Sequence, residues 1–206
     1  MPSRARHGRG LLRRRCVLPE ATVSRAAVFL DRDGTISEEV GYLNHLSRFR
    51  IFPFASGAIR LLNSAKLAVI VVTNQSGLAR GYFPESLVHN VHELMTQQLA
   101  AAGAHLDAIY YCPHASGDGC GCRKPRIGLL ERASQEHGLD LRRSFVVGDR
   151  YDDVELAHRA GCRGVLLRTG YGEGELAWHA MRWPAPPDFV ARDLAEGAEW
   201  IVGQTR

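Results

Sequence analysis

Residues 26–35 read AAVFLDRDGT, an apolar run that ends in two aspartates, Asp31 and Asp33, separated by an arginine. The apolar part is typical of a short buried strand. If the extended geometry continues past that strand, the two carboxylates point the same way. They would then repel each other unless a cation lay between them, and Mg²⁺ is the hard, oxygen-preferring ion that such a pair favours. Taken alone, however, the pattern is also typical of a solvated acidic turn.

The rest of the chain alternates between short apolar runs and helical patterns. We predict strands at 26–30, 67–72, 107–111, 144–147, 164–167 and 189–191. We predict helices at 55–64, 84–101, 128–137 and 152–160. This alternation predicts an α/β fold with a mostly parallel sheet and helices on both faces. In such sheets, ligands bind at the carboxyl ends of the strands.

Polar motifs follow three more of these strands. TNQSG at 73–77 follows the second, RKP at 123–125 follows the third and its loop, and GDRYDD at 148–153 follows the fourth. The Thr73 hydroxyl could hold a phosphate oxygen, and Asp149 could complete a Mg²⁺ shell. Lys124 is one of two lysines among 26 basic residues. Apart from chance, one explanation is that a compact ammonium suits a position facing both a carboxylate and a phosphate.

Together the segments DRDGT, TNQSG, RKP and GDRYDD resemble motifs I to IV of haloacid dehalogenase-type phosphatases, over residues 26 to about 200. The resemblance implies a three-layer, Rossmann-like fold with no large cap domain. It implies that Asp31 is the nucleophile and Asp33 the general acid/base. It further implies that Thr73 and Lys124, with Arg123, stabilise the phosphoryl group. Mg²⁺ would be bound by Asp31, the backbone carbonyl of Asp33, and Asp149.

A second constellation lies at 112–122. Cys112, His114, Cys120 and Cys122 make a Cys₃His set within eleven positions, which is typical of a closed, tetrahedral, structural zinc site. Buried thiols beside a surface histidine are the alternative. Because Cys122 is joined directly to Arg123, we expect zinc to stiffen the loop that carries the phosphate binders.

The cysteine cluster running straight into RKP resembles the D-glycero-D-manno-heptose-1,7-bisphosphate 7-phosphatase branch, and a closely similar branch contains histidinol-phosphate phosphatases. This resemblance implies removal of the 7-phosphate of the heptose bisphosphate, with histidinol phosphate as the alternative substrate. A nucleic-acid 3′-phosphatase and a zinc-stabilised nucleic-acid-binding module are less favoured alternatives. Arg150 stands where the heptose enzymes often have lysine, and Asp152 and Asp153 are both candidates for the later acidic position of the fourth motif. The implied substrate contacts are Glu39, Val40, Gly41, Tyr42, Asn74, Gln75, Ser76, Arg123, Lys124 and Arg150.

Residues 1–25 carry seven arginines against one acid, Glu20. We expect a disordered basic leader there, followed by one phosphatase domain at 26–206. A nucleic-acid-binding arm is the alternative, disfavoured because the basic run lacks interleaved aromatic residues. No apolar run is long enough to span a bilayer, and the clustered thiols favour the cytoplasm. We further expect a monomer, and histidines other than His114 on the surface.

Overall fold

The computed structural model describes residues 24–205, so almost all of the predicted basic leader at 1–25 lies outside the described residues. Within the described part, no helix combines the length and apolar character needed to cross a membrane.

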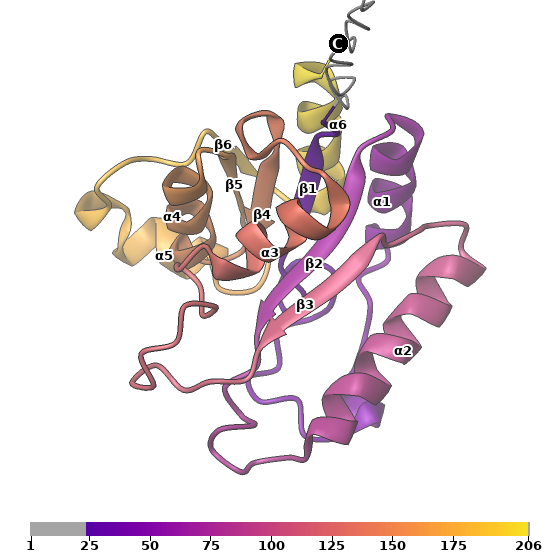
Figure 1. Ribbon diagram of the computed structural model, residues 1–206, viewed down its shortest axis with the longest axis vertical. Coiled ribbons are helices and arrows are strands. Elements are labelled where there is room, and N and C mark those ends of the chain that lie inside the picture. The colour runs from indigo at the N-terminus through magenta and orange to yellow at the C-terminus, as the bar shows by residue number, and fades with distance from the viewer. Residues whose placement is uncertain (1–23, 206) are drawn as a thin grey trace, which may run out of the picture.

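A six-stranded sheet runs through the described residues, and all of its strand pairs are parallel (Figure 1). The strand order is β3-β2-β1-β4-β5-β6, which places β1 at the centre. All four residues of β1 are fully buried, as expected for a parallel strand covered on both faces. The strands are β1 (Ala27–Leu30), β2 (Ala68–Asn74), β3 (Ala108–Cys112), β4 (Phe145–Gly148), β5 (Arg163–Leu167) and β6 (Phe189–Ala191).

Helices cover both faces of this sheet (Figure 1). One face packs against α1 (Ala55–Ser64), α2 (Glu85–Ala101) and α6 (Leu194–Gln204). The other packs against α3 (Gly128–His137) and α4 (Tyr151–Ala160). Along β1, Val28 and Leu30 belong to the first hydrophobic cluster, and Ala27 and Phe29 to the second. This alternation confirms the predicted three-layer α/β architecture.

The observed elements differ from the predicted ones at several boundaries. Strand β2 continues to Asn74 rather than ending at residue 72, because Thr73 and Asn74 still pair with β3. Helix α6 was not predicted, although Leu194, Ala198 and Ile201 form its buried stripe. Also unpredicted are α5 (Gly172–Trp178) and the short 3₁₀ helices Leu46–Arg48, Leu141–Arg143 and Ala180–Arg182.

The carboxyl ends of β1 and β4 define where a ligand can bind. From β1 the chain enters α1 on one face, whereas from β4 it enters α4 on the opposite face. Such a divergence leaves a crevice above the two strand ends. Residues 31–54 cross this edge as a compact loop, in which Gly34 adopts a φ of 76°. No domain-sized cap is inserted among the described residues, so the crevice stays open to solvent.

Candidate active site

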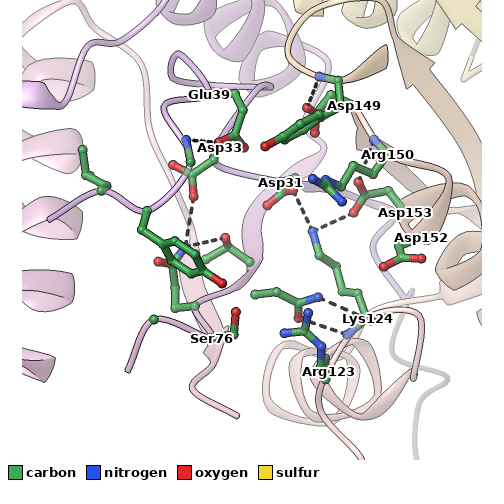
Figure 2. Close-up of a pocket in the computed structure, with 18 of the residues that line it drawn as sticks. Asp31, Asp33, Glu39, Ser76, Arg123, Lys124, Asp149, Arg150, Asp152 and Asp153 are labelled. Atoms are coloured by element: carbon green, nitrogen blue, oxygen red, sulfur yellow. Dashed lines mark hydrogen bonds and ion pairs between the residues drawn. The ribbon is translucent and has the colours of Figure 1, made fainter. Parts of the chain in front are cut away.

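A buried ammonium lies between two carboxylates at the centre of this crevice (Figure 2). The Lys124 Nζ atom is 2.9 Å from Asp31 Oδ2 and 2.6 Å from Asp153 Oδ1. Only 4% of Lys124 is exposed. Burial alone would lower the pKa of this lysine, but the charges of Asp153 and Asp31 outweigh burial and raise it. Lys124 therefore stays protonated at neutral pH.

Asp149 brings a third carboxylate to the same place. Oxygens of Asp31, Asp149 and Asp153 all lie within 4.8 Å of one another. Burial, followed by the charge of Asp31, raises the pKa of Asp149 to about 8. Ionising all three carboxylates beside one ammonium would leave an excess of negative charge, which a divalent cation would relieve. The all-oxygen donor set fits a hard ion.

Asp31 and Asp149 were both predicted as Mg²⁺ ligands, and the structure brings their carboxylates together. It adds Asp153, which is 1% exposed and was predicted only as one of two candidates, with Asp152, for the later acidic position. Asp153 is held by the turn that starts α4, where its carboxylate accepts the backbone N–H of Arg150. The side chain of Asp33 is not part of this cluster. A contact between Asp33 and a metal would therefore have to come from its backbone carbonyl, as predicted.

Asp149 is fixed in place by the loop at 169–171, which was not predicted to belong to the site. The Tyr171 backbone N–H donates to Asp149 Oδ2 at 2.8 Å, and the Thr169 hydroxyl donates to the Gly34 carbonyl. A Cβ atom at Gly34 or at Gly170 would collide with the Asp149 carboxylate. Both glycines are therefore required by close packing around the carboxylate cluster as well as by their positive φ angles.

Asp33 points toward the other side of the crevice, where it accepts three hydrogen bonds. The Arg32 guanidinium contacts it as a fork, with Nε 3.0 Å from Oδ1 and Nη2 2.7 Å from Oδ2. Gln75 Nε2 donates to Oδ2 at 3.0 Å and also to Thr73 Oγ1. The predicted acid/base residue and the predicted phosphate-binding threonine are thus connected through one amide.

The structure contradicts the expectation that His92 is a surface residue. His92 is 9% exposed, because it lies on the face of α2 that packs toward the sheet. Its Nε2 atom is 3.3 Å from Arg32 Nη1. Burial, together with the positive charge of Arg32, lowers the pKa of His92 to about 3. His92 is therefore neutral near pH 7 and can accept a hydrogen bond from Arg32.

The position of Lys124 along the chain is set by Asn74 at the end of β2. Asn74 Oδ1 accepts the backbone N–H of Lys124, and Asn74 Nδ2 donates to the Lys124 carbonyl. Asn74 was also predicted to contact substrate, and these two bonds leave one hydrogen of its amide group available. Asn74 thus anchors the 123–125 segment to the end of β2.

The cysteine cluster comes together beside this segment. Cys112 Sγ is 3.6 Å from Cys120 Sγ and 3.3 Å from Cys122 Sγ, and His114 Nδ1 is 3.3 Å from Cys122 Sγ. All four predicted ligand atoms lie within 4.8 Å of one another, so the cluster could hold a metal ion. Arg123 Nη1 donates to the His114 carbonyl at 3.2 Å, which connects the cluster to the crevice.

The crevice encloses a cavity of about 290 Å³. Most predicted substrate contacts line it: Glu39, Gly41, Tyr42, Asn74, Gln75, Ser76, Arg123, Lys124 and Arg150. Val40 instead packs its side chain against the hydrophobic core. Arg80, Phe83 and Tyr171 also line the cavity and were not predicted. The Arg150 guanidinium lies 3.9 Å from the centre of the Tyr171 ring, a cation–π contact.

The sequence and the fold of this chain are similar to those of known proteins. A family model described as HAD-hydrolase-like matches residues 121–197. A D-glycero-D-manno-heptose-1,7-bisphosphate 7-phosphatase from Thermosynechococcus vestitus is 43% identical, covering 86% of this chain and 95% of that protein. A D-glycero-beta-D-manno-heptose-1,7-bisphosphate 7-phosphatase from Yersinia pestis is 40% identical, covering 85% and 94%.

A solved structure agrees with these relatives. The D,D-heptose 1,7-bisphosphate phosphatase from B. bronchiseptica, complexed with magnesium and phosphate, aligns with a TM-score of 0.80. It is 35% identical, and the alignment covers 87% of this chain and 99% of that one. The chain therefore belongs to the haloacid dehalogenase-like hydrolases and, within them, to the family of heptose-bisphosphate phosphatases.

Because His92 is buried and neutral, we predict that the protein loses stability in acid as this residue becomes protonated. Its pKa is about 3 in the folded protein and about 6.5 when exposed, so between these values the unfolded chain binds a proton that the folded one does not. Protonation of His92 therefore costs no stability above pH 6.5, and the free energy of unfolding falls as the pH drops from 6.5 toward 3. By pH 5 this residue should remove about 2 kcal/mol from the free energy of unfolding.

Urea unfolding at pH 7 and pH 5 measures this effect. Between pH 7 and pH 5, the free energy of unfolding should decline by about 2 kcal/mol less in a His92→Gln variant than in the wild type. The exposed His89 on the same helix provides the control, since His89→Gln should decline as the wild type does. Equal declines in the wild type and His92→Gln would show that His92 does not resist protonation.

Proposed function

We propose that this protein hydrolyses a phosphate monoester through an aspartyl-phosphate formed on Asp31. The observation that carries the proposal is the buried cluster in which Lys124 Nζ contacts Asp31 Oδ2 at 2.9 Å, beside the carboxylates of Asp149 and Asp153. The Lys124 ammonium offsets the negative charge that the neighbouring carboxylates place around Asp31, and a carboxylate can attack phosphorus as a nucleophile. The open crevice gives a phosphate ester access to it.

The reaction would proceed in two displacements. An Asp31 oxygen attacks phosphorus, the bond to the ester oxygen breaks, and Asp33 supplies the proton that this oxygen takes up. Asp33 then removes a proton from water as that water attacks the aspartyl-phosphate, which releases inorganic phosphate and restores Asp31. Throughout, Lys124 and the Thr73 hydroxyl would donate to the phosphoryl oxygens.

Mg²⁺ is the cofactor that we propose for the carboxylate cluster, held by Asp31, Asp149 and the backbone carbonyl of Asp33. When bound, it would neutralise charge on the phosphoryl oxygens. For the Cys₃His cluster we propose Zn²⁺ in a structural role, because four protein ligands leave no open position on a tetrahedral ion.

As substrate we propose D-glycero-D-manno-heptose 1,7-bisphosphate, attacked at its 7-phosphate. Relatives at 37–43% identity are named for this reaction. Arg80, Arg123 and Arg150 line the cavity around Lys124, and guanidinium groups suit a second phosphate, which histidinol phosphate lacks. Glu39 lines the same cavity and can accept hydrogen bonds from sugar hydroxyls.

Replacing Asp31 by asparagine tests the nucleophile. Asp31→Asn should lower kcat by more than about a thousand-fold, because the amide cannot form the covalent intermediate. The circular dichroism spectrum should remain that of the wild type, and Glu93→Gln, an exposed change on α2, should leave turnover unchanged. Turnover by purified Asp31→Asn within tenfold of the wild type, a margin of about 1.4 kcal/mol, would exclude Asp31 as the nucleophile.

Replacing Cys120 by serine tests the zinc site. Metal analysis should give about one zinc per chain for the wild type and much less for Cys120→Ser. Loss of the ion should lower stability by about 2 kcal/mol, or Tm by roughly 4–8 °C. Cys162→Ala alters a buried thiol outside the cluster and should retain zinc. A stable Cys120→Ser variant with neither zinc nor loss of activity would refute the structural role.

Kinetics on two substrates test the specificity. The kcat/KM for the heptose 1,7-bisphosphate should exceed that for histidinol phosphate by at least about a hundred-fold, since the second phosphate gains charge-assisted hydrogen bonds. Arg123→Ala should lower the ratio of the two kcat/KM values by a larger factor than it lowers kcat/KM for histidinol phosphate. A preference for histidinol phosphate would reassign the substrate while leaving the chemistry in place.

A further inference from the structure

We infer that Arg32 and His92 are positioning residues that hold the carboxylate of Asp33 where it can exchange a proton with the leaving group and with water. The inference rests on the proposed role of Asp33 as general acid/base. Neither Arg32 nor His92 lines the cavity, and Asp33 is the cavity-lining carboxylate that the Arg32 guanidinium contacts.

Arg32 is the largest side chain in the described protein that is almost completely buried, at 1% exposure. A buried guanidinium is stable only when its donors are paired. Two of its nitrogens, Nε and Nη2, are used on Asp33, and Nη1 is used on His92. The planar fork fixes the orientation of the carboxylate as well as its position, which the single ammonium of a lysine could not do.

The local backbone explains why two successive residues can meet in this way. Arg32 and Asp33 would point to opposite faces in a continuing strand. Instead the chain turns at once, and the Arg32 carbonyl accepts the backbone N–H groups of Ile36 and Ser37 at 2.9 Å each. This turn lets the guanidinium fold back beneath Asp33. Gln75 then holds the same carboxylate from the loop after β2.

His92 completes the arrangement from outside the loop. It belongs to α2, which packs against the sheet, and its neutral ring presents Nε2 to Arg32 Nη1. The contact joins the long, flexible side chain of Arg32 to a helix that packs against the sheet. Without an acceptor at this place, Nη1 would be buried and unpaired, which is unfavourable enough to shift the guanidinium. A shift of about 1 Å in a group that positions a catalytic residue can lower a rate by up to about a hundred-fold.

A displaced Asp33 should affect substrates differently according to their leaving group. Protonation by Asp33 is needed when an alkoxide leaves, as from a sugar phosphate, but hardly at all when p-nitrophenolate leaves. The parameter kcat/KM reports the steps up to departure of the leaving group. A misplaced Asp33 should therefore lower kcat/KM for the alkyl phosphate and spare kcat/KM for p-nitrophenyl phosphate. A general loss of folded protein would lower both equally.

The experiment measures this ratio of kcat/KM values in the full chain with Mg²⁺ present. The alkyl phosphate is the heptose 1,7-bisphosphate, or histidinol phosphate if the enzyme prefers it. His92→Phe and His92→Leu, which lack the acceptor, should lower the ratio about tenfold. His92→Gln, whose carbonyl replaces Nε2, should remain within about twofold of the wild type. His89→Phe, an exposed change one turn away on α2, should leave the ratio unchanged.

Asp33→Asn separates failure of the inference from failure of the proposed function. It should lower the ratio at least about a hundred-fold. If Asp33→Asn does so while the His92 variants lose both activities equally, or lose neither, then Asp33 is the acid and the positioning role is wrong. If Asp33→Asn itself leaves the ratio unchanged, Asp33 is not the acid, and both the assignment and the inference fail.

Discussion

The contact between the Lys124 ammonium and the carboxylates of Asp31 and Asp153 is the interaction on which the rest of the site depends. Three carboxylates could not be buried together at the end of a parallel sheet without a fixed positive charge among them. The cation is delivered by a loop rather than by a strand, so its backbone has to be anchored separately. Asn74 provides that anchor from β2, and the cysteine cluster provides a second one through Arg123.

The fold was largely predictable because it depends on apolar runs whose lengths and spacing suit buried parallel strands. The same rule located Asp31, Thr73 and Asp149, since each directly follows or ends such a run. Asp153 could not be chosen over its neighbour Asp152, because that choice depends on the residue at which α4 begins. The helix starts at Tyr151, which turns Asp153 inward and leaves Asp152 exposed.

Arg32 and His92 escaped prediction for a different reason. The sequence presents Arg32 as the spacer between two aspartates, and nothing in its neighbours reveals that the chain turns back at that point. His92 lies sixty positions away, at a spacing that carries no signal of a contact. Its position among Val88, Val91 and Met95 on the apolar stripe of α2 was the one available clue, and it indicated burial rather than function.

Substitutions around the open crevice fall into two groups, those that alter the chemical groups and those that alter the walls facing a substrate. The groups proposed for the chemistry sit on strand ends and on tightly packed turns, where Gly34 and Gly170 leave no room for a larger residue. Most of the walls that face a substrate belong to surface loops, around Tyr42 and between Ser76 and Phe83, whose sequence and length the sheet does not dictate. Substitutions in these surface loops can therefore change which phosphate ester fits the cavity. The residues proposed for the chemistry can stay the same while the substrate changes, which makes the protein evolvable.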